Sequence, residues 1–377
     1  MIYLDASATT PVKKEVLEEF NRVSNEFIGN PNSTHELGVK ANHVIEEATN
    51  SIANLFNIKP SEIIYTSGAS ESNNLAIKGI AFKHGKSGKH IITSRFEHPS
   101  TIGPLGWLQK IGFEVDLLEF DDHGKIDLNH LKSILREDTI LVTLSALNSE
   151  LGITQPIEDV GKILKEYPNC YFHVDMTQEI GKEPIDLNYI DLASISAHKF
   201  YGIKGIGALI KKDNVEIEPL IHGGSSTTIY RSGTPAPALI ASLAKALELA
   251  TTDLDNNLNR MKIINDYLRK ELSLFNNVVI NSPDDANPYI LNFSVVGANP
   301  KEIQRLLSDR GVYISIGTAC QTGYEVSPSV LALTGNEEIA SSSMRISLTN
   351  NIEKADINEF LKLFKECLEV VSWKLLE

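Results

Sequence analysis

The first two thirds of the chain alternate between two hydrophobic patterns. Short apolar runs typical of buried strands are interleaved with stretches in which apolar residues recur every three or four positions, as they do on one face of a helix. Strands are expected at residues 62–65, 89–93, 113–118, 139–144, 171–175, 191–196 and 206–210, and helices at 99–110, 128–136 and 157–167. This order predicts an α/β fold with a mostly parallel seven-stranded sheet that carries helices on both faces.

The last third of the chain has a different order of elements. A long helical pattern from Leu239 to Leu249 continues into a second one that ends near Leu272. Beyond it, strands are expected at 278–281, 289–295, 312–315 and 343–348, and helices at 300–309 and 353–370, with a loop between the last two strands. We therefore predict a large domain of residues 15–255 and a smaller α/β domain made of residues 1–14 and 256–377.

Composition and charge narrow the class of protein. Of the 377 residues, 42% are hydrophobic and 22% are charged, as in an ordinary globular protein, and the net charge is −14. This acidic balance argues against a nucleic acid or an acidic membrane surface as a direct partner. Apolar runs fall short of the roughly 20 residues that a membrane helix needs, and the first residues show no secretory pattern. We expect a cytoplasmic protein.

The three cysteines, Cys170, Cys320 and Cys367, are far apart in the sequence. An odd number without close spacing fits neither a disulfide framework nor a zinc site, so no metal is expected. Cys320 lies between Gly317 and Gly323, which suggests a mobile surface loop with either a reactive thiol or a chance surface cysteine. The other two thiols are interpreted as buried or incidental.

Lys199 follows the strand expected at 191–196 and precedes a glycine-rich bend. A lone lysine of this kind is most often an exposed loop residue. The alternative is a lysine that forms a Schiff base, which requires a rigid strand end, a partly desolvated amine and polar neighbours. Ser196 and His198 supply such neighbours.

Residues 66–74 read Thr-Ser-Gly-Ala-Ser-Glu-Ser-Asn-Asn and join a short strand to a helix. The unpaired backbone N–H groups at the start of a helix form a seat for a phosphate. The same letters also suit an ordinary helix cap, with Ser67 or Ser70 as the capping residue.

Other polar residues follow the ends of expected strands, where ligands of such sheets bind. Asp175 could pair with a pyridinium nitrogen or cap a helix, and Gln178 could donate to a phenolate oxygen or lie on the surface. His98 could stack on an aromatic cofactor and carry protons, or it could be an ordinary loop histidine that is hydrogen-bonded locally. In the smaller domain, Arg345 could bind a substrate carboxylate or form an interdomain salt bridge. His173, in mid-strand, is interpreted as a core residue.

Taken together, these stretches resemble the cysteine desulfurases, which are pyridoxal 5'-phosphate (PLP) enzymes of the class V aminotransferase branch of fold type I. The matching segments run almost end to end and are residues 3–5, 29–31, 66–75, 97–98, 173–175, 177–178, 196–199, 231–234, 317–320 and 344–347. The resemblance implies a PLP-dependent transferase of fold type I that acts as a homodimer.

The resemblance also implies a role for each matching residue. Lys199 would form the Schiff base and carry the proton, with His98 stacked on the cofactor ring. Asp175 would pair with the ring nitrogen and Gln178 with the phenolate oxygen. The phosphate and substrate contacts would come from Ala69, Ser70, Ser196 and His198, from Thr234 of the second subunit, and from Arg345, which would hold the substrate carboxylate.

Cys320 would be the nucleophile that takes sulfur from L-cysteine as a persulfide and leaves L-alanine. The pattern of its loop resembles that of enzymes which pass sulfur to an iron–sulfur scaffold or to a tRNA-thiolation enzyme. These two kinds of sulfur-acceptor protein are therefore the expected partners.

The chain departs from the family pattern near the expected substrate. Ser149 stands between Asn148 and Glu150 where the family usually has a second asparagine, and residues 225–228 read Ser-Ser-Thr-Thr instead of the usual polar-Glu pattern. These changes leave selenocysteine cleavage or transamination as alternative reactions. A nucleotide-binding or sulfur-carrier protein is a further alternative, but Gly205 and Gly207 are too little of a dinucleotide-binding motif.

Overall fold

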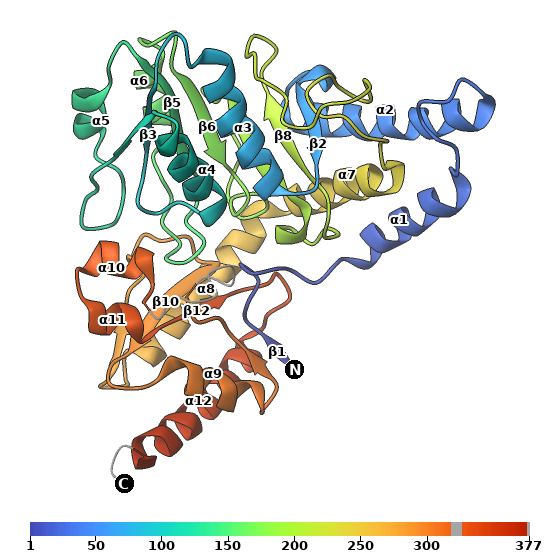
Figure 1. Ribbon diagram of the computed structural model, residues 1–377. Coiled ribbons are helices and arrows are strands. Elements are labelled where there is room, and N and C mark those ends of the chain that lie inside the picture. The colour runs from blue at the N-terminus through green and yellow to red at the C-terminus, as the bar shows by residue number, and fades with distance from the viewer. Residues whose placement is uncertain (318–325, 375–377) are drawn as a thin grey trace.

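The computed structural model describes residues 1–317 and 326–374, and it places them in two packed bodies (Figure 1). The larger body is built on a seven-stranded sheet, and the smaller one contains the first residues and the described part of the last third of the chain.

The sheet of the larger body has the strand order β2-β8-β7-β6-β5-β3-β4. Strand β8 runs antiparallel to both of its neighbours, whereas the other adjacent pairs are parallel. The mostly parallel sheet predicted from the sequence is therefore confirmed. Its strands are Ile63–Thr66 (β2), His90–Thr93 (β3), Glu114–Leu117 (β4), Thr139–Ser145 (β5), Tyr171–Asp175 (β6), Leu192–Ser196 (β7) and Gly207–Lys211 (β8).

Helices cover both faces of this sheet, and five of its strands are accordingly buried along their whole length. Helices α3 (Ala69–His84) and α4 (Pro99–Lys110) pack on one face in a common apolar cluster. The other face is covered by α2 (Glu36–Phe56), α5 (Leu128–Ile134), α6 (Ile157–Leu164) and α7 (Pro237–Thr251), and α1 (Lys14–Glu26) packs against α7.

The smaller body has its own apolar core, which combines residues from the start and the end of the chain. Strand β1 (Ile2–Tyr3) pairs in parallel with β11 (Val312–Tyr313). Strands β9 (Val278–Ile280), β10 (Ile290–Val295) and β12 (Ser343–Ser347) form an antiparallel sheet, accompanied by α8 (Leu254–Leu272), α9 (Pro300–Ser308) and α12 (Lys354–Lys374). This separate core supports the proposed division into two domains, whose boundaries stay a prediction.

The sequence analysis was wrong about the whole of residues 316–342 being a loop. Two short helices lie there, α10 (Pro328–Thr334) and α11 (Glu337–Ser341). Each begins at a side-chain cap, because Ser327 accepts from the Val330 amide and Asn336 from the Glu338 and Ile339 amides. Helices this short show too few turns for a hydrophobic period to be recognised.

Within the described residues, no helix is both long and apolar enough to cross a lipid bilayer.

Gly207 is the residue at which β8, the loop before α3 and β7 approach most closely. A Cβ atom at this position would lie 2.4 Å from the carbonyl oxygen of Ile195 and 2.7 Å from the Cα atom of Gly68. Both are backbone atoms that cannot move independently of the sheet, so only glycine fits here.

Replacing Gly207 by alanine is expected to lower the free energy of unfolding by about 2 kcal/mol or more, because the sheet must open to admit the methyl group. Urea denaturation measures the change. Gly103→Ala is the control, since a Cβ at this exposed helical position meets nothing within 4 Å and should stabilise by about 0.5 kcal/mol. Equal stability of Gly207→Ala and the wild type would contradict this account.

Candidate active site

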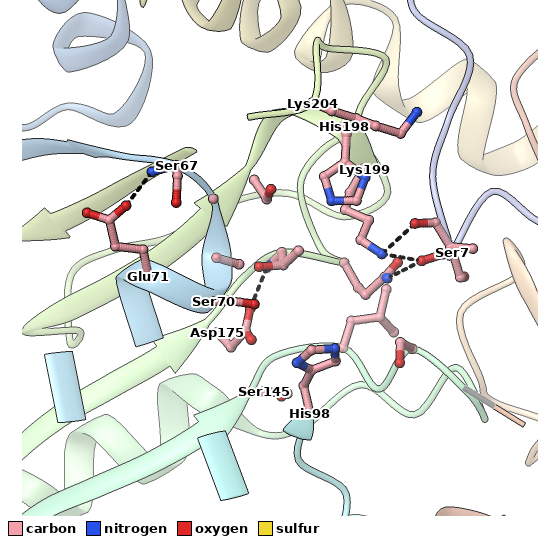
Figure 2. Close-up of a pocket in the computed structure, with 18 of the residues that line it drawn as sticks. Ser7, Ser67, Ser70, Glu71, His98, Ser145, Asp175, His198, Lys199 and Lys204 are labelled. Atoms are coloured by element: carbon pink, nitrogen blue, oxygen red, sulfur yellow. Dashed lines mark hydrogen bonds between the residues drawn. The ribbon is translucent and has the colours of Figure 1, made fainter. Parts of the chain in front are cut away.

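A cavity of about 330 Å³ opens at the carboxyl ends of the parallel strands of the large sheet. Its walls come from the segments that follow β2, β3, β5, β6 and β7, from the amino-terminal residues and from β12. Figure 2 shows Ser70, His98, Asp175 and Lys199 around this space. The sequence analysis placed its candidate residues at these strand ends, and the structure brings most of them together.

Lys199 ends a short 3₁₀ turn, Ala197–Lys199, directly after β7. Its Nζ atom donates to the carbonyl oxygens of Ser7 at 2.6 Å and Ala8 at 2.9 Å, as Figure 2 shows for the Ser7 side. The amide of Thr10 in turn donates to the carbonyl of His198. The amino-terminal segment therefore holds the lysine at the edge of the cavity.

Helix α3 points its amino terminus at the cavity. Its N-cap is Gly68, whose φ of 150° favours glycine, and no side chain caps the helix. Within the described part of the chain, the Ala69 and Ser70 amides have no acceptor. Two unpaired amides at the positive end of a helix dipole, next to the Ser196 hydroxyl, form an anion seat.

His198 also lines the cavity. Its Nδ1 atom lies 3.1 Å from the Thr9 hydroxyl oxygen. Burial and the positive charges of Lys199 and Lys204 lower the pKa of His198 to about 4. The ring is therefore neutral near pH 7, and it can hydrogen-bond an anion without contributing a charge.

His98 caps helix α4 and lines the opposite side of the cavity. Its Nδ1 atom accepts from the Ser100 amide at 3.1 Å and lies 2.7 Å from the Ser100 hydroxyl. Since Nδ1 is an acceptor, a neutral ring carries its proton on Nε2. The cap thus fixes both the position and the tautomer of this histidine.

Asp175, the last residue of β6, is 6% exposed. Its carboxylate accepts from the Asn73 side chain at 2.7 Å and from the Thr177 amide at 3.0 Å. No ion pair to this carboxylate is found within residues 1–317 and 326–374. A buried carboxylate without a cation is costly, and a protonated ring nitrogen in the cavity would supply the missing charge.

Asn73 is a site residue that the sequence analysis missed. It is fully buried in α3, and its Nδ2 atom donates both to Asp175 and, at 2.9 Å, to the hydroxyl of Ser100. Ser100 is the residue that holds His98. The Asn73 side chain therefore connects the Asp175 carboxylate, through Ser100, to His98. The sequence does not show this connection, because it depends on the packing of α3 against α4 and β6.

Arg345, on β12, is 1% exposed and reaches the cavity from the smaller body. Its guanidinium donates to the carboxylate of Asp5 at 2.9 Å and to the carbonyl of Ser149 at 3.0 Å. Arg345 therefore forms a salt bridge, but within the predicted smaller domain, which contains Asp5 as well, and not between domains. Its role toward a substrate carboxylate stays a prediction, although its place in the cavity wall allows it. The Ser149 side chain does not take part in either contact, although Ser149 lines the cavity as well.

Three buried polar atoms of the cavity wall have no hydrogen-bond partner among the described residues: Ser7 Oγ, Thr177 Oγ1 and Arg345 Nε. Buried polar atoms are nearly always paired. Together with the anion seat and Asp175, these atoms fit a ligand that carries a phosphate, a polar aromatic ring and further oxygen atoms. The residues present therefore fit PLP.

Two predicted site residues are not brought to this cavity by the described chain. Thr234 is exposed and lines a neighbouring hollow with Ser67, Gly205 and Arg231. Cys320 lies outside the described residues. The buried position of His173 agrees with its interpretation as a core residue. Cys170 and Cys367 are buried as well, which was one of the two interpretations given for these thiols.

Comparison with known proteins gives a consistent result. Residues 2–360 match the family described as aminotransferase class-V. The chain is 41% identical over 373 residues to cysteine desulfurase IscS of Dictyoglomus turgidum, with 98% of this chain and 94% of the relative covered. It is 39% identical to the mitochondrial cysteine desulfurase of Saccharomyces cerevisiae, with 96% and 73% covered.

Solved structures show the same relationship. A NifS-like protein superposes with a TM-score of 0.93 at 35% identity, covering 98% of this chain and 99% of that one. A structure described as SspA in complex with cysteine has a TM-score of 0.82 at 37% identity, covering 92% and 99%.

The fold and the site thus define a class V aminotransferase. Within that class the chain belongs to the cysteine desulfurase family. The resemblance stated from the sequence motifs is confirmed, and so is the fold.

We expect Asn73→Ala to lower the free energy of unfolding by about 2 kcal/mol, because Asp175 loses a buried donor, and to weaken the binding of PLP. Asn74→Ala is the matched control: Asn74 is the next residue of the same helix, and its side chain only reaches the Ser70 carbonyl at 2.9 Å. Denaturation and cofactor titration measure the two effects. Indistinguishable results for the two variants would contradict the role of Asn73.

Glu97 gives the site a pH dependence. Burial, and to a smaller extent the negative charge of Asp175, raises the pKa of Glu97 to about 7. The hydrogen bonds from Ser94 and Ser145 lower the pKa, but their effect is smaller than that of burial. Because this pKa lies above the usual value of 4.5, the folded protein binds an extra proton between these pH values. Its free energy of unfolding therefore falls as pH rises from about 4.5 to about 7.

Glu97→Gln should make this decline smaller by on the order of 3 kcal/mol. Part of the decline should remain, because burial also raises the pKa of Glu179, to about 8. Replacement of the exposed Glu15 by Gln should leave the whole decline unchanged. Urea unfolding at about pH 5 and about pH 8 compares the three proteins. The same pH dependence in Glu97→Gln and in the wild type would show that Glu97 titrates normally.

Proposed function

We propose that this chain uses PLP to remove sulfur from L-cysteine, with Lys199 as the lysine that binds the cofactor and Cys320 as the sulfur acceptor. The observation that carries the proposal is the shared cavity, in which the Lys199 amine, the Asp175 carboxylate and the unpaired amides of α3 lie together. The family relationship and the solved cysteine complex of a related protein support it.

The residues that would hold PLP divide by chemistry. The amides of Ala69 and Ser70, the Ser196 hydroxyl and His198 suit its phosphate, and Asp175 suits its ring nitrogen. Gln178 lines the cavity and suits the phenolate oxygen. When bound, PLP supplies an electron-withdrawing ring that makes the α-carbon of an attached amino acid acidic.

The chain's own residues then orient the substrate and move protons. Arg345 has further N–H groups beyond those engaged by Asp5 and Ser149, including the unpartnered Nε, and these suit the substrate carboxylate. Lys199 Nζ carries the proton of the α-carbon, and the Nε2 atom of His98 carries protons on the opposite side. Asp175 keeps a proton on the ring nitrogen.

In the sulfur transfer, the sulfur atoms are oxidised by two electrons and the β-carbon of the substrate is reduced by two. The thiolate of Cys320 attacks the substrate sulfur, an S–S bond forms, and the C–S bond breaks with its electron pair left on carbon. That carbon takes up a proton, so that L-alanine leaves and Cys320 keeps a persulfide. An iron–sulfur scaffold or a tRNA-thiolation enzyme is the proposed acceptor of this sulfur.

The proposed enzyme is a homodimer. Thr234 would complete the phosphate site of the partner, which agrees with its exposure and with its lining a neighbouring hollow instead of the cavity of its own chain. Cytoplasmic localisation is part of the same proposal.

The test has two variants and one control. The purified protein should bind PLP, and borohydride should link the cofactor covalently to Lys199, whereas Lys199→Ala should gain no such label. Cys320→Ser should retain the cofactor and lose persulfide formation at least a hundredfold, since the nucleophile is gone. Cys170→Ala removes a buried thiol that lies outside the site and should behave as the wild type. Persulfide in Cys320→Ser, or borohydride labelling elsewhere, would overturn the assignment.

Ser149 raises the question of which amino acid is the preferred substrate, because it lies on the cavity wall beside Arg345. Alanine release from L-cysteine and from L-selenocysteine should favour L-cysteine. A higher yield from selenocysteine would identify the alternative reaction, a selenocysteine lyase.

A further inference from the structure

Lys182 lies behind the cavity wall, in the turn that follows β6, and is 4% exposed. Its Nζ atom donates to the backbone carbonyl of Gln178 at 2.7 Å and to the side-chain oxygen Oε1 of Gln178 at 3.2 Å. An ammonium group can only donate, so the Gln178 amide must turn its oxygen toward Lys182 and its Nε2 atom the other way.

We propose that Lys182 is a positioning residue, which fixes the Gln178 amide so that its N–H groups face the cavity and suit an anionic oxygen of the cofactor. The inference rests on the proposed function and deepens it. Without Lys182, the hydrogen bond from Gln178 Nε2 to the Ser7 carbonyl would be the one described contact left to oppose an exchange of the amide oxygen and nitrogen. After such an exchange, an acceptor would face an anion.

The Gln178 side chain is also connected to Lys199 through a shared hydrogen-bond acceptor. Gln178 Nε2 donates to the carbonyl oxygen of Ser7 at 2.9 Å, which is the same oxygen that accepts from Lys199 Nζ at 2.6 Å. Lys182, Gln178, Ser7 and Lys199 therefore form one chain of contacts from behind the cavity wall to the reactive amine. The second N–H of the Gln178 amide is left for a ligand.

The positive charge of Lys182 is a second way in which this residue can favour an anionic ligand in the cavity. Burial lowers the pKa of Lys182 to about 7, and the positive charges of Lys199 and Arg345 act in the same direction. Glu183 is the opposing charge, but its carboxylate is engaged by Thr154 at 2.6 Å and Asn287 at 2.9 Å. In the described chain no carboxylate lies within ion-pair distance of Lys182, so a bound anion would stabilise its charge.

The experiment compares Lys182→Met with Lys211→Met. Lys211 is a matched control, because it is 2% exposed, has a lowered pKa and donates to two backbone carbonyls, those of Lys212 and Val215. It lies at the far end of β8 and does not line the cavity. Both variants therefore lose a buried lysine, but only Lys182→Met loses the contact with Gln178.

The dissociation constant of PLP is measured by titrating each apoprotein, as a readout separate from turnover. Lys182→Met should weaken binding about tenfold relative to the wild type, as expected for one charge-supported hydrogen bond, and Lys211→Met should not. The difference should be largest below about pH 7 and shrink above it, as Lys182 loses its proton in the wild type. Lys182→Arg should retain most of the affinity.

Each outcome decides a different point. Equal dissociation constants for Lys182→Met and Lys211→Met, or a difference that does not change with pH, would overturn the role of Lys182 and leave the proposed function intact. If Lys182→Met does not fold, Lys182→Arg and Gln178→Leu decide, because the role requires the first to bind PLP as the wild type does and the second to bind it about tenfold more weakly. A wild-type protein that binds no PLP would contradict the proposed function itself.

Discussion

The hydrogen bonds of the amino-terminal segment are the interaction on which the site depends. This segment is anchored in the smaller body by the pairing of β1 with β11 and by the ion pair between Asp5 and Arg345. A few residues later its carbonyl groups accept from Lys199 and Gln178. The segment therefore contacts both bodies, and its hydrogen bonds to Lys199 and Gln178 connect them at the cavity wall.

Electrostatic balance explains why the cavity suits a dipolar cofactor. The start of α3 offers two amides without an acceptor among the described residues, and His198 in the cavity wall is neutral. The carboxylate of Asp175 has hydrogen-bond donors but no ion-pair partner among the described residues. A ligand with a negative phosphate at one end and a protonated ring nitrogen at the other satisfies both. Neither end would be stable if buried without its counterpart.

Much of this arrangement could be predicted from the sequence. Parallel strands bring their carboxyl ends to one edge. The alternation of strands and helices, the position of the residues after strands and the family motifs were therefore enough to group Lys199, Asp175 and His98. Asn73 and Lys182 could not be found in this way. Lys182 follows Glu179 and Ile180 in a turn with several charges, which is typical of a surface segment, and only the tertiary fold buries it behind Gln178.

The pairing of β1 with β11 has a consequence for synthesis of the chain. The ribosome releases the first residues long before residues 312 and 347, with which they pair. The large sheet can form while translation continues, but the clamp on Lys199 must wait until the carboxyl-terminal third has emerged. In the nascent protein, the large sheet can therefore form before the reactive amine is held in place.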